Sequence, residues 1–231
     1  MSEIRPGPLT VLSKLSARVR SRGFREVADL ITHRVKEELH SEDRLIFFVR
    51  PTATGEESSS PRTEDLRLVR ARPEHGELYE RDIGTDSAST FRGRLSDATR
   101  CYLVLEGERA LHATWVTTKA SWVRELRRYF RPPEGSAYVY ESFTRADARG
   151  RGVYPFALRG ICTDLGTDGL GRVWVAVEAD NPPSLKAVRK AGFEEAFEIS
   201  YQRRWGRITV SEPEGPRADL CPDCFLKKLD E

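Results

Sequence analysis

Residues 149–154, Arg-Gly-Arg-Gly-Val-Tyr, place two glycines and two arginines within one short turn. Glycine lets the backbone approach a ligand without a Cβ in the way, and the amides that open a helix bind anions. Arg149 and Arg151 add positive charge. Residues of these types at this spacing predict a cradle for a diphosphate. The segment matches neither G-x-G-x-x-G nor G-x-x-x-x-G-K-[ST], and taken alone it also fits an ordinary turn.

The elements that would hold this turn lie on both sides of it. Residues 138–144 have the composition of a strand and residues 155–165 that of a helix, so the turn leads from a strand into a helix. Further along, residues 172–178 are rich in β-branched types and predict a buried strand. A short helix over 185–191 should follow, and Gly192 would end it.

Together the two units resemble the acetyl-CoA-binding segments of the GNAT superfamily of N-acetyltransferases. The family's first motif, Arg/Gln-x-x-Gly-x-Gly/Ala, is similar to residues 149–154. Its second, Asn-x-x-Ser/Ala before a helix that ends in Gly-Phe, is similar to residues 181–193, which begin with Asn181 and end with Gly192-Phe193. The clear resemblance covers about residues 137–200, and a weaker one reaches back to about Asp65.

Two positions depart from the family pattern. The first motif ends in Tyr154 instead of Gly or Ala, and a ring there would crowd a phosphate unless it points away or stacks. Many family members carry a tyrosine in the helix before Gly-Phe, where it protonates the departing thiolate. The matching position here is Val188.

The resemblance implies an α/β fold with a GNAT-like mixed central sheet, splayed parallel strands and helices on both faces. Apolar residues at helical spacing over 8–39 add a helical N-terminal extension. The resemblance also implies acetyl-CoA, or another acyl-CoA, as co-substrate, with the pantetheine arm in the gap between the splayed strands. The residues it implies for cofactor binding are Phe143, Thr144, Arg149, Gly150, Arg151, Gly152, Val153, Asn181 and Ser184.

Transfer to an amine needs a base near neutral pH. Glu141 is the first candidate, because a carboxylate on the splayed strand serves as base in many family members; the alternative is a structural ion pair with an arginine. His112 is the second, since histidine titrates in the useful range, and its alternative is a satisfied core histidine. For the missing acid, Tyr154, Tyr140 and Ser184 are the nearby hydroxyls.

Composition narrows the substrate class. Charges nearly cancel, to a net +2, so no nucleic-acid partner is expected, and no apolar run approaches the roughly 20 residues of a membrane span. The N-terminus lacks a signal-like apolar segment, which predicts a cytoplasmic protein. The favoured reading is an N-acyltransferase, most simply an N-acetyltransferase, for a small-molecule amine, with a homodimer possible. The alternatives are a protein or peptide N-acetyltransferase and a non-catalytic module that binds CoA or a partner.

The chain divides into four expected parts. Residues 1–50 form an N-terminal extension with helices over 8–39 and a short strand over 44–49, and residues 51–64 form a flexible linker. Residues 65–210 form the acyltransferase domain, in which 121–129 are helical or loop. Residues 211–231 form a tail.

The tail carries Cys221 and Cys224 as a C-x-x-C pair, which fits half a zinc site, a redox pair or no special role. No metal is predicted, because a structural zinc site needs four ligands and no second pair is present.

Overall fold

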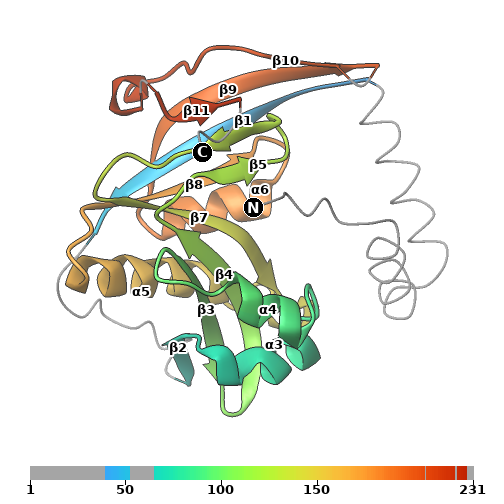
Figure 1. The fold of residues 1–231 in the computed structure, drawn as a ribbon, viewed down its shortest axis with the longest axis vertical. Helices are drawn as coiled ribbons and strands as arrows, with labels where there is room; N and C mark the ends of the chain where they lie inside the picture. The colour runs from blue at the N-terminus through green and yellow to red at the C-terminus, as the bar shows by residue number, and fades with distance from the viewer. Residues whose placement is uncertain (1–39, 53–64, 206, 222, 228–231) are drawn as a thin grey trace. The chain divides into compact units, whose positions relative to one another are not determined.

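The protein was analysed as a computed structural model that describes residues 40–52, 65–205, 207–221 and 223–227 (Figure 1). The predicted N-terminal helices over 8–39 and most of the predicted linker lie outside these residues. The chain divides into a unit of Asp43–Tyr201 with Val210–Glu231 and a smaller unit of Met1–Glu42 with Gln202–Thr209. Apart from strand residues within 40–42 and 202–209, which belong to the smaller unit, the description below concerns the first unit.

Strands dominate the described residues. They are β1 (His40–Pro51), β2 (Leu66–Arg70), β3 (Thr99–Glu106), β4 (Arg109–Thr117), β5 (Ser121–Val123), β6 (Arg128–Phe130), β7 (Ser136–Thr144), β8 (Arg172–Glu178), β9 (Glu194–Arg204), β10 (Arg207–Val210) and β11 (Phe225–Leu226). The helices are α3 (Gly76–Asp82), α4 (Ala88–Arg94), α5 (Val153–Thr167) and α6 (Pro182–Lys190), with 3-10 turns η2 (Pro73–His75), η3 (Ala146–Ala148) and η4 (Ala218–Leu220).

The central sheet has eight strands in the order β10-β9-β1-β8-β7-β4-β3-β2. Neighbouring strands pair antiparallel in β1–β8, β2–β3, β3–β4 and β4–β7, whereas β7 and β8 are parallel. The short strand predicted over 44–49 exists as part of β1. It lies inside the central sheet, with Phe47 opposite Ala176 of β8, so the expected boundary after residue 50 does not separate it from the sheet.

Helices cover both faces of this sheet. On one face, α5 and α6 bury Leu158, Ile161 and Val188 against β-branched residues of β7 and β8. On the other, α3 and α4 lie over β3 and β4 (Figure 1) and enclose a cluster around Phe91 and Trp115. The mixed α/β fold class predicted from the sequence, with a parallel strand pair and helices on both faces, is confirmed.

A second, three-stranded sheet in the order β11-β6-β5 adds to the face opposite α5. The ring of Phe47 contacts Phe130 of β6 at 4.9 Å and Phe225 of β11 at 5.3 Å between ring centroids. The prediction of helix or loop over 121–129 is wrong, because this stretch contains β5 and the start of β6. Three-residue strands carry too little alternation to be recognised, and the aromatic contacts that hold them are distant in sequence.

The segment predicted as a tail is packed against the same cluster. Phe225 contacts the rings of Phe130 and Phe197, and the carbonyl of Cys224 accepts a hydrogen bond of 2.7 Å from the Arg131 amide. Cys221 and Cys224 form a disulfide and both are buried. These contacts make the described part of the segment a component of the domain.

Candidate active site at the gap between β7 and β8

Strands β7 and β8 pair along only part of their length. Ser136 to Val139 pair with Arg172 to Val175, and the pairing then ends, although β7 continues to Thr144 and β8 to Glu178. Beyond Val139, β7 stays paired with β4 on its other side. Within the described part of the chain, the edge of β7 from Tyr140 to Thr144 therefore faces a gap in place of a strand. This is the splayed parallel pair that the sequence predicts.

A β-bulge marks the point where the gap opens. Tyr140 pairs with Trp115 and Phe143 with Ala113, so Glu141 and Ser142 together lie opposite the single residue Thr114. Glu141 has a φ of 47°, a left-handed conformation that costs a non-glycine residue on the order of 1–3 kcal/mol. A strained bulge turns neighbouring side chains in new directions, and here the two bulge residues face opposite sides of the sheet.

The glycine turn follows β7 and the short turn η3 and leads into α5. Gly150 and Gly152 have φ values of 75° and 81°, and Gly152 is the residue before α5. A Cβ at either glycine would meet nothing within 4 Å. Among the described residues, no backbone carbonyl outside α5 accepts from the amides of Gly150, Arg151, Gly152 or Val153, and the first amides of a helix have no partner within it. The turn thus presents unpaired donors beside open space, which fits an oxyanion ligand.

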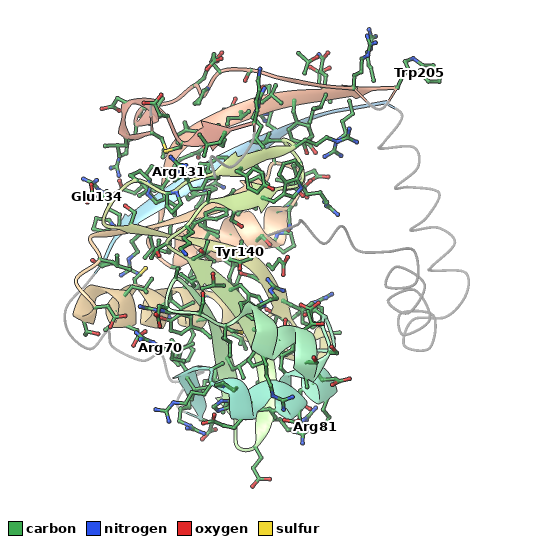
Figure 2. The ribbon with its side chains drawn as sticks, viewed as in Figure 1. Arg70, Arg81, Arg131, Glu134, Tyr140 and Trp205 are labelled. Atoms are coloured by element: carbon green, nitrogen blue, oxygen red, sulfur yellow. A yellow bond between two sulfur atoms is a disulfide. The ribbon has the colours of Figure 1, made fainter. Side chains whose placement is uncertain are left out.

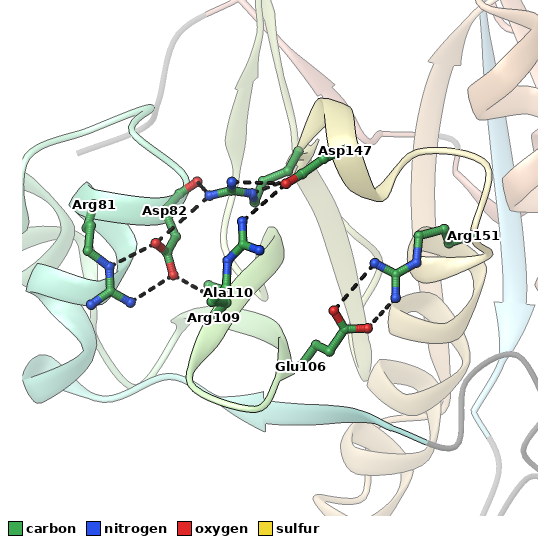
Figure 3. Close-up of polar contacts among 8 residues, drawn as sticks. Arg81, Asp82, Glu106, Arg109, Ala110, Asp147 and Arg151 are labelled. Atoms are coloured by element: carbon green, nitrogen blue, oxygen red, sulfur yellow. Dashed lines mark hydrogen bonds and ion pairs between the residues drawn. The ribbon is translucent and has the colours of Figure 1, made fainter.

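The arginine side chains of the turn are engaged by protein atoms. Arg151 forms an ion pair with Glu106 at the end of β3 (Figure 3). Arg149 Nε donates to the carbonyl of Thr144 at 3.3 Å. Both arginines are exposed, and exposed ion pairs contribute little to stability, so an arriving phosphate can compete for them at small cost.

The loop before the turn is held by a cluster of charges. Arg109 and Arg145 both pair with Asp147 of η3, at 3.2 Å and 3.1 Å; Figure 3 shows Arg109 beside Asp147. Asp82 accepts from the amide of Ala110 at 2.8 Å. These contacts tie η3 to the β3–β4 hairpin and α3, and so they fix the path from β7 into the glycine turn.

A buried polar network lies on the α5 face of the gap. His112 is hydrogen-bonded through Nδ1 to Thr144 at 2.7 Å and through Nε2 to Thr114 at 3.0 Å. Thr114 is hydrogen-bonded to Ser142. His112 and Thr114 are fully buried, whereas Ser142 is exposed.

Burial sets the protonation states in this network. It lowers the pKa of His112 to about 3 and raises the pKa of Tyr154 to about 12, because a low-dielectric surrounding disfavours the charged form of each group. His112 is thus a neutral core histidine with both ring nitrogens bonded, which is the alternative weighed for it above. The ring of Tyr154 lies 5.2 Å from the His112 ring, so it points into the sheet and away from the turn.

Glu141 lies on the opposite face, near α4. Its carboxylate is 2.7 Å from Arg94, and its side chain is 62% exposed, which leaves it accessible to a substrate. The Arg94 guanidinium stacks over the ring of Trp115 at 3.9 Å and also pairs with Asp86 at 2.7 Å. Tyr140, labelled in Figure 2, packs against the apolar cluster that contains Trp115 beneath α3 and α4. The structure thus shows the ion pair considered for Glu141, at a position where the carboxylate still meets solvent.

Two of the remaining predicted residues, Asn181 and Ser184, lie at the start of α6. Asn181 is its N-cap, and its side chain accepts from the Ser184 amide at 3.2 Å. Phe143 packs against the cluster beneath α3 and α4. Val188 is fully buried among core residues of α5 and the sheet. The position where the family carries its acid is therefore a core position in this chain.

Sequence reasoning did not find Ser142, Thr114, Arg94 or Glu178. Glu178 ends β8 on the far side of the gap and accepts a hydrogen bond of 3.3 Å from the Tyr201 hydroxyl. Burial, and then the negative charge of Glu125, raise its pKa above the ordinary value. Polar and apolar residues alternate in two stretches, His-Ala-Thr at 112–114 and Ser-Phe-Thr at 142–144. Because the two stretches lie on neighbouring strands, this shared pattern could have indicated the network.

No group of three or more metal-ligating side chains occurs within the described ranges. None of the helices in this part of the chain is both long and apolar enough to span a bilayer.

Solved structures with a similar chain path include acetyltransferases. One of the GNAT family from Novosphingobium aromaticivorans aligns over 69% of this chain and 63% of its own, with 14% identity and a TM-score of 0.47. A GNAT acetyltransferase from Colwellia psychrerythraea aligns over 75% and 60%, with 15% identity and a TM-score of 0.47. The aminoglycoside N-acetyltransferase AAC(6′)-Iy in complex with CoA aligns over 56% and 92%, with 15% identity and a TM-score of 0.45.

The alignment spans less than two thirds of the first two proteins. No protein-family model matches the chain, and no curated protein was found to be similar to it. The likeness is one of fold.

Proposed function

We propose that this protein is an acyl-CoA-dependent N-acyltransferase, most simply an N-acetyltransferase, that acts on a primary amine of a small molecule by direct attack in a ternary complex. One combination carries the proposal: a gap between parallel strands leads to a glycine turn whose amides have no described backbone acceptor and whose glycines have open space at the Cβ position. The acyl-CoA would place its diphosphate against residues 149–153 and its pantetheine arm along β7 from Thr144 towards Tyr140.

In this arrangement the protein would accelerate the reaction mainly by positioning the amine and the thioester. Holding an amine against a thioester in a fixed geometry can supply on the order of 7–11 kcal/mol. Glu141 would take the amine proton, directly or through water, and Arg94 would hold the carboxylate at the bulge. Phe143, Asn181 and Ser184 would line the cofactor arm, with Asn181 and Ser184 placed by their helix-cap hydrogen bond.

The test has two stages. Calorimetry with CoA measures binding without any acceptor, and we expect saturable binding at one site per chain. Release of thiol from acetyl-CoA is then followed with spermidine, glucosamine, lysine methyl ester and a peptide with a free N-terminus. Thiol release with the small amines supports the proposal, and release with the peptide alone would indicate a peptide acetyltransferase. Binding without transfer would indicate a non-catalytic module, and absence of CoA binding would exclude the proposal.

Cytoplasmic location is a separate prediction. The disulfide between Cys221 and Cys224 is of a kind that persists mainly in oxidising compartments. Thiol labelling of the protein in intact cells would show both cysteines as reduced thiols if the prediction is right.

A further inference from the structure

The polar network beneath the gap ends in one exposed hydroxyl, that of Ser142. The other members inside the sheet, His112 and Thr114, are fully buried. Ser142 occupies the bulge, where β7 has left β8 and no strand among the described residues pairs with it on that side. A buried hydrogen-bond network whose one exposed hydroxyl lies beside a proposed ligand site suggests that this hydroxyl contacts the ligand.

The hydrogen bonds of the network allow the Ser142 proton to point outward. When Thr144 donates to His112 Nδ1, His112 Nε2–H donates to Thr114, and Thr114 in turn donates to the Ser142 Oγ. A hydroxyl carries one proton. In this arrangement the Ser142 oxygen accepts from the core side, and its own proton is left to donate into the gap.

The proposed function places the reacting sulfur close to this proton. The diphosphate end of the ligand would lie at residues 149–153, so the thioester at the other end of the arm would lie where the gap narrows. Strand residues advance about 3.3 Å each, so the stretch from Thr144 to Tyr140 spans about 13 Å and ends at the bulge. Val188 offers no hydroxyl from α6.

We propose, on the basis of the function proposed above, that the Ser142 hydroxyl donates a hydrogen bond to the CoA sulfur as it leaves. Ser142 would be a catalytic residue in place of the tyrosine that this chain lacks at position 188. Thr114 and His112 would be positioning residues that orient its hydroxyl.

The bonds and charges of the step balance. The amine nitrogen attacks the thioester carbon, a C–N bond forms, and the carbonyl π electrons move to oxygen. When those electrons return, the C–S bond breaks and its electron pair stays on sulfur. The hydrogen bond from Ser142 stabilises that negative charge. The proton lost by the amine passes to Glu141 and then to water, and the released thiolate takes a proton from water. A fixed donor aimed at a developing charge is the principle of the oxyanion hole.

The test compares Ser142→Ala with Ser142→Thr, which keeps a hydroxyl. Thr167→Ala is the control, because Thr167 is exposed on α5 and bonds only the carbonyl of Asp164 in its own helix turn. We expect Ser142→Ala to lower kcat for thiol release from acetyl-CoA about tenfold to hundredfold, with the Kd for CoA unchanged within about twofold. Ser142→Thr should restore most of the loss, and Thr167→Ala should match the wild type.

Retention of wild-type kcat in Ser142→Ala would overturn the inference. So would a loss of CoA affinity as large as the loss in kcat, since that is the mark of a damaged cofactor site. Failure of the proposed function is recognised separately, because the wild-type protein would then show no CoA binding or no transfer.

The positioning residues are tested by non-additivity. Thr114→Val removes the hydrogen-bond partner of the Ser142 oxygen and should lower kcat severalfold with little change in KM. Made in the Ser142→Ala background, the same change should not lower kcat further, because its effect acts through Ser142. Equal losses in both backgrounds would show a purely structural role and would contradict the assignment.

Discussion

The ring of Tyr154 lies 5.2 Å from the imidazole of His112, at an interplanar angle of 30°. The bulky residue at the end of the glycine turn therefore fills space between α5 and β4, and it leaves the amides before it clear. This resolves the first departure from the family motif. The glycines that matter for close approach are Gly150 and Gly152, and the tyrosine instead joins the turn to the polar network under β7.

The bulge gives the proposed site its two sides. Glu141 and Ser142 are consecutive, yet Glu141 pairs with Arg94 on the α4 face while Ser142 bonds Thr114 on the α5 face. An amine would approach from one face and a thiolate would depart toward the other. Two neighbouring residues can therefore serve the two halves of one acyl transfer.

Gly152→Ala should weaken binding of CoA at least tenfold. At a φ of 81° a Cβ costs about 1–2 kcal/mol, and it would also occupy the space into which a phosphate must come. Gly169→Ala is the matched control, because Gly169 has a φ of 83°, nothing within 4 Å of its Cβ position, and lies just beyond the other end of α5. Both variants should lose similar stability in urea unfolding, and only the first should lose affinity by calorimetry. Equal affinities would remove the turn from the cofactor site.

Glu141→Gln should lower kcat for acetyl transfer by about 10²–10⁴, the usual contribution of a general base, with the affinity for CoA preserved. Glu195→Gln provides the control. Glu195 is likewise an exposed glutamate that pairs with an arginine, Arg189, and its side chain is 46% exposed, but it lies on β9. Initial rates of thiol release under saturating acetyl-CoA measure the effect. Unchanged turnover in Glu141→Gln would exclude this residue as the base.

Much of the site was predictable because its elements are continuous in sequence. The strand that ends in Thr144, the glycine turn and α5 form one run, and the run from Arg172 through Asn181 to α6 forms another. Each carries its own pattern of β-branched residues, glycines and caps. Partial pairing of β7 with β8 could be expected only through resemblance, because no local pattern states where two strands part.

What the sequence did not reveal depends on partners far away in the chain. Arg94 is one of many arginines until α4 places it over Trp115. Phe225 packs on Phe47, and these two residues lie near opposite ends of the described chain. The sequence alone does not show this contact, so the C-terminal segment is predicted to be a polar tail. Val188 is a core residue, which a helix pattern indicates, whereas the placement of the Ser142 hydroxyl beside the gap follows only from the fold.

His112 should make stability depend on pH in a defined window. Its folded pKa, about 3, is below the ordinary value of 6.5, so below about pH 6.5 the unfolded chain binds a proton that the folded protein does not. Stability conferred by the neutral ring is complete above pH 6.5 and is lost as pH falls towards 3, by up to about 1.4 kcal/mol per pH unit. Urea unfolding from pH 7 to pH 4 should show a shallower slope in His112→Gln.

Should that variant fail to fold, ¹⁵N NMR of the wild-type imidazole provides the same information. The ring should remain neutral down to about pH 4. A mid-point near 6.5 would contradict the buried network.

Glu178→Gln should stabilise the protein at neutral pH. The pKa of Glu178 is raised by burial and by the charge of Glu125, so ionising this carboxyl costs more in the folded than in the unfolded state. The cost is absent below the ordinary pKa of 4.5 and appears as pH rises through and above it. Urea unfolding should therefore show the variant as more stable than the wild type at pH 7, with the difference shrinking towards pH 4. A constant difference at both pH values would mean that the ionisation of Glu178 is not the cause.

The same variant also tests which carboxylate is the base. If Glu141 is the base, Glu178→Gln should keep most of its acetyl transfer. A loss as large as that of Glu141→Gln would assign the role of base to Glu178, across the gap.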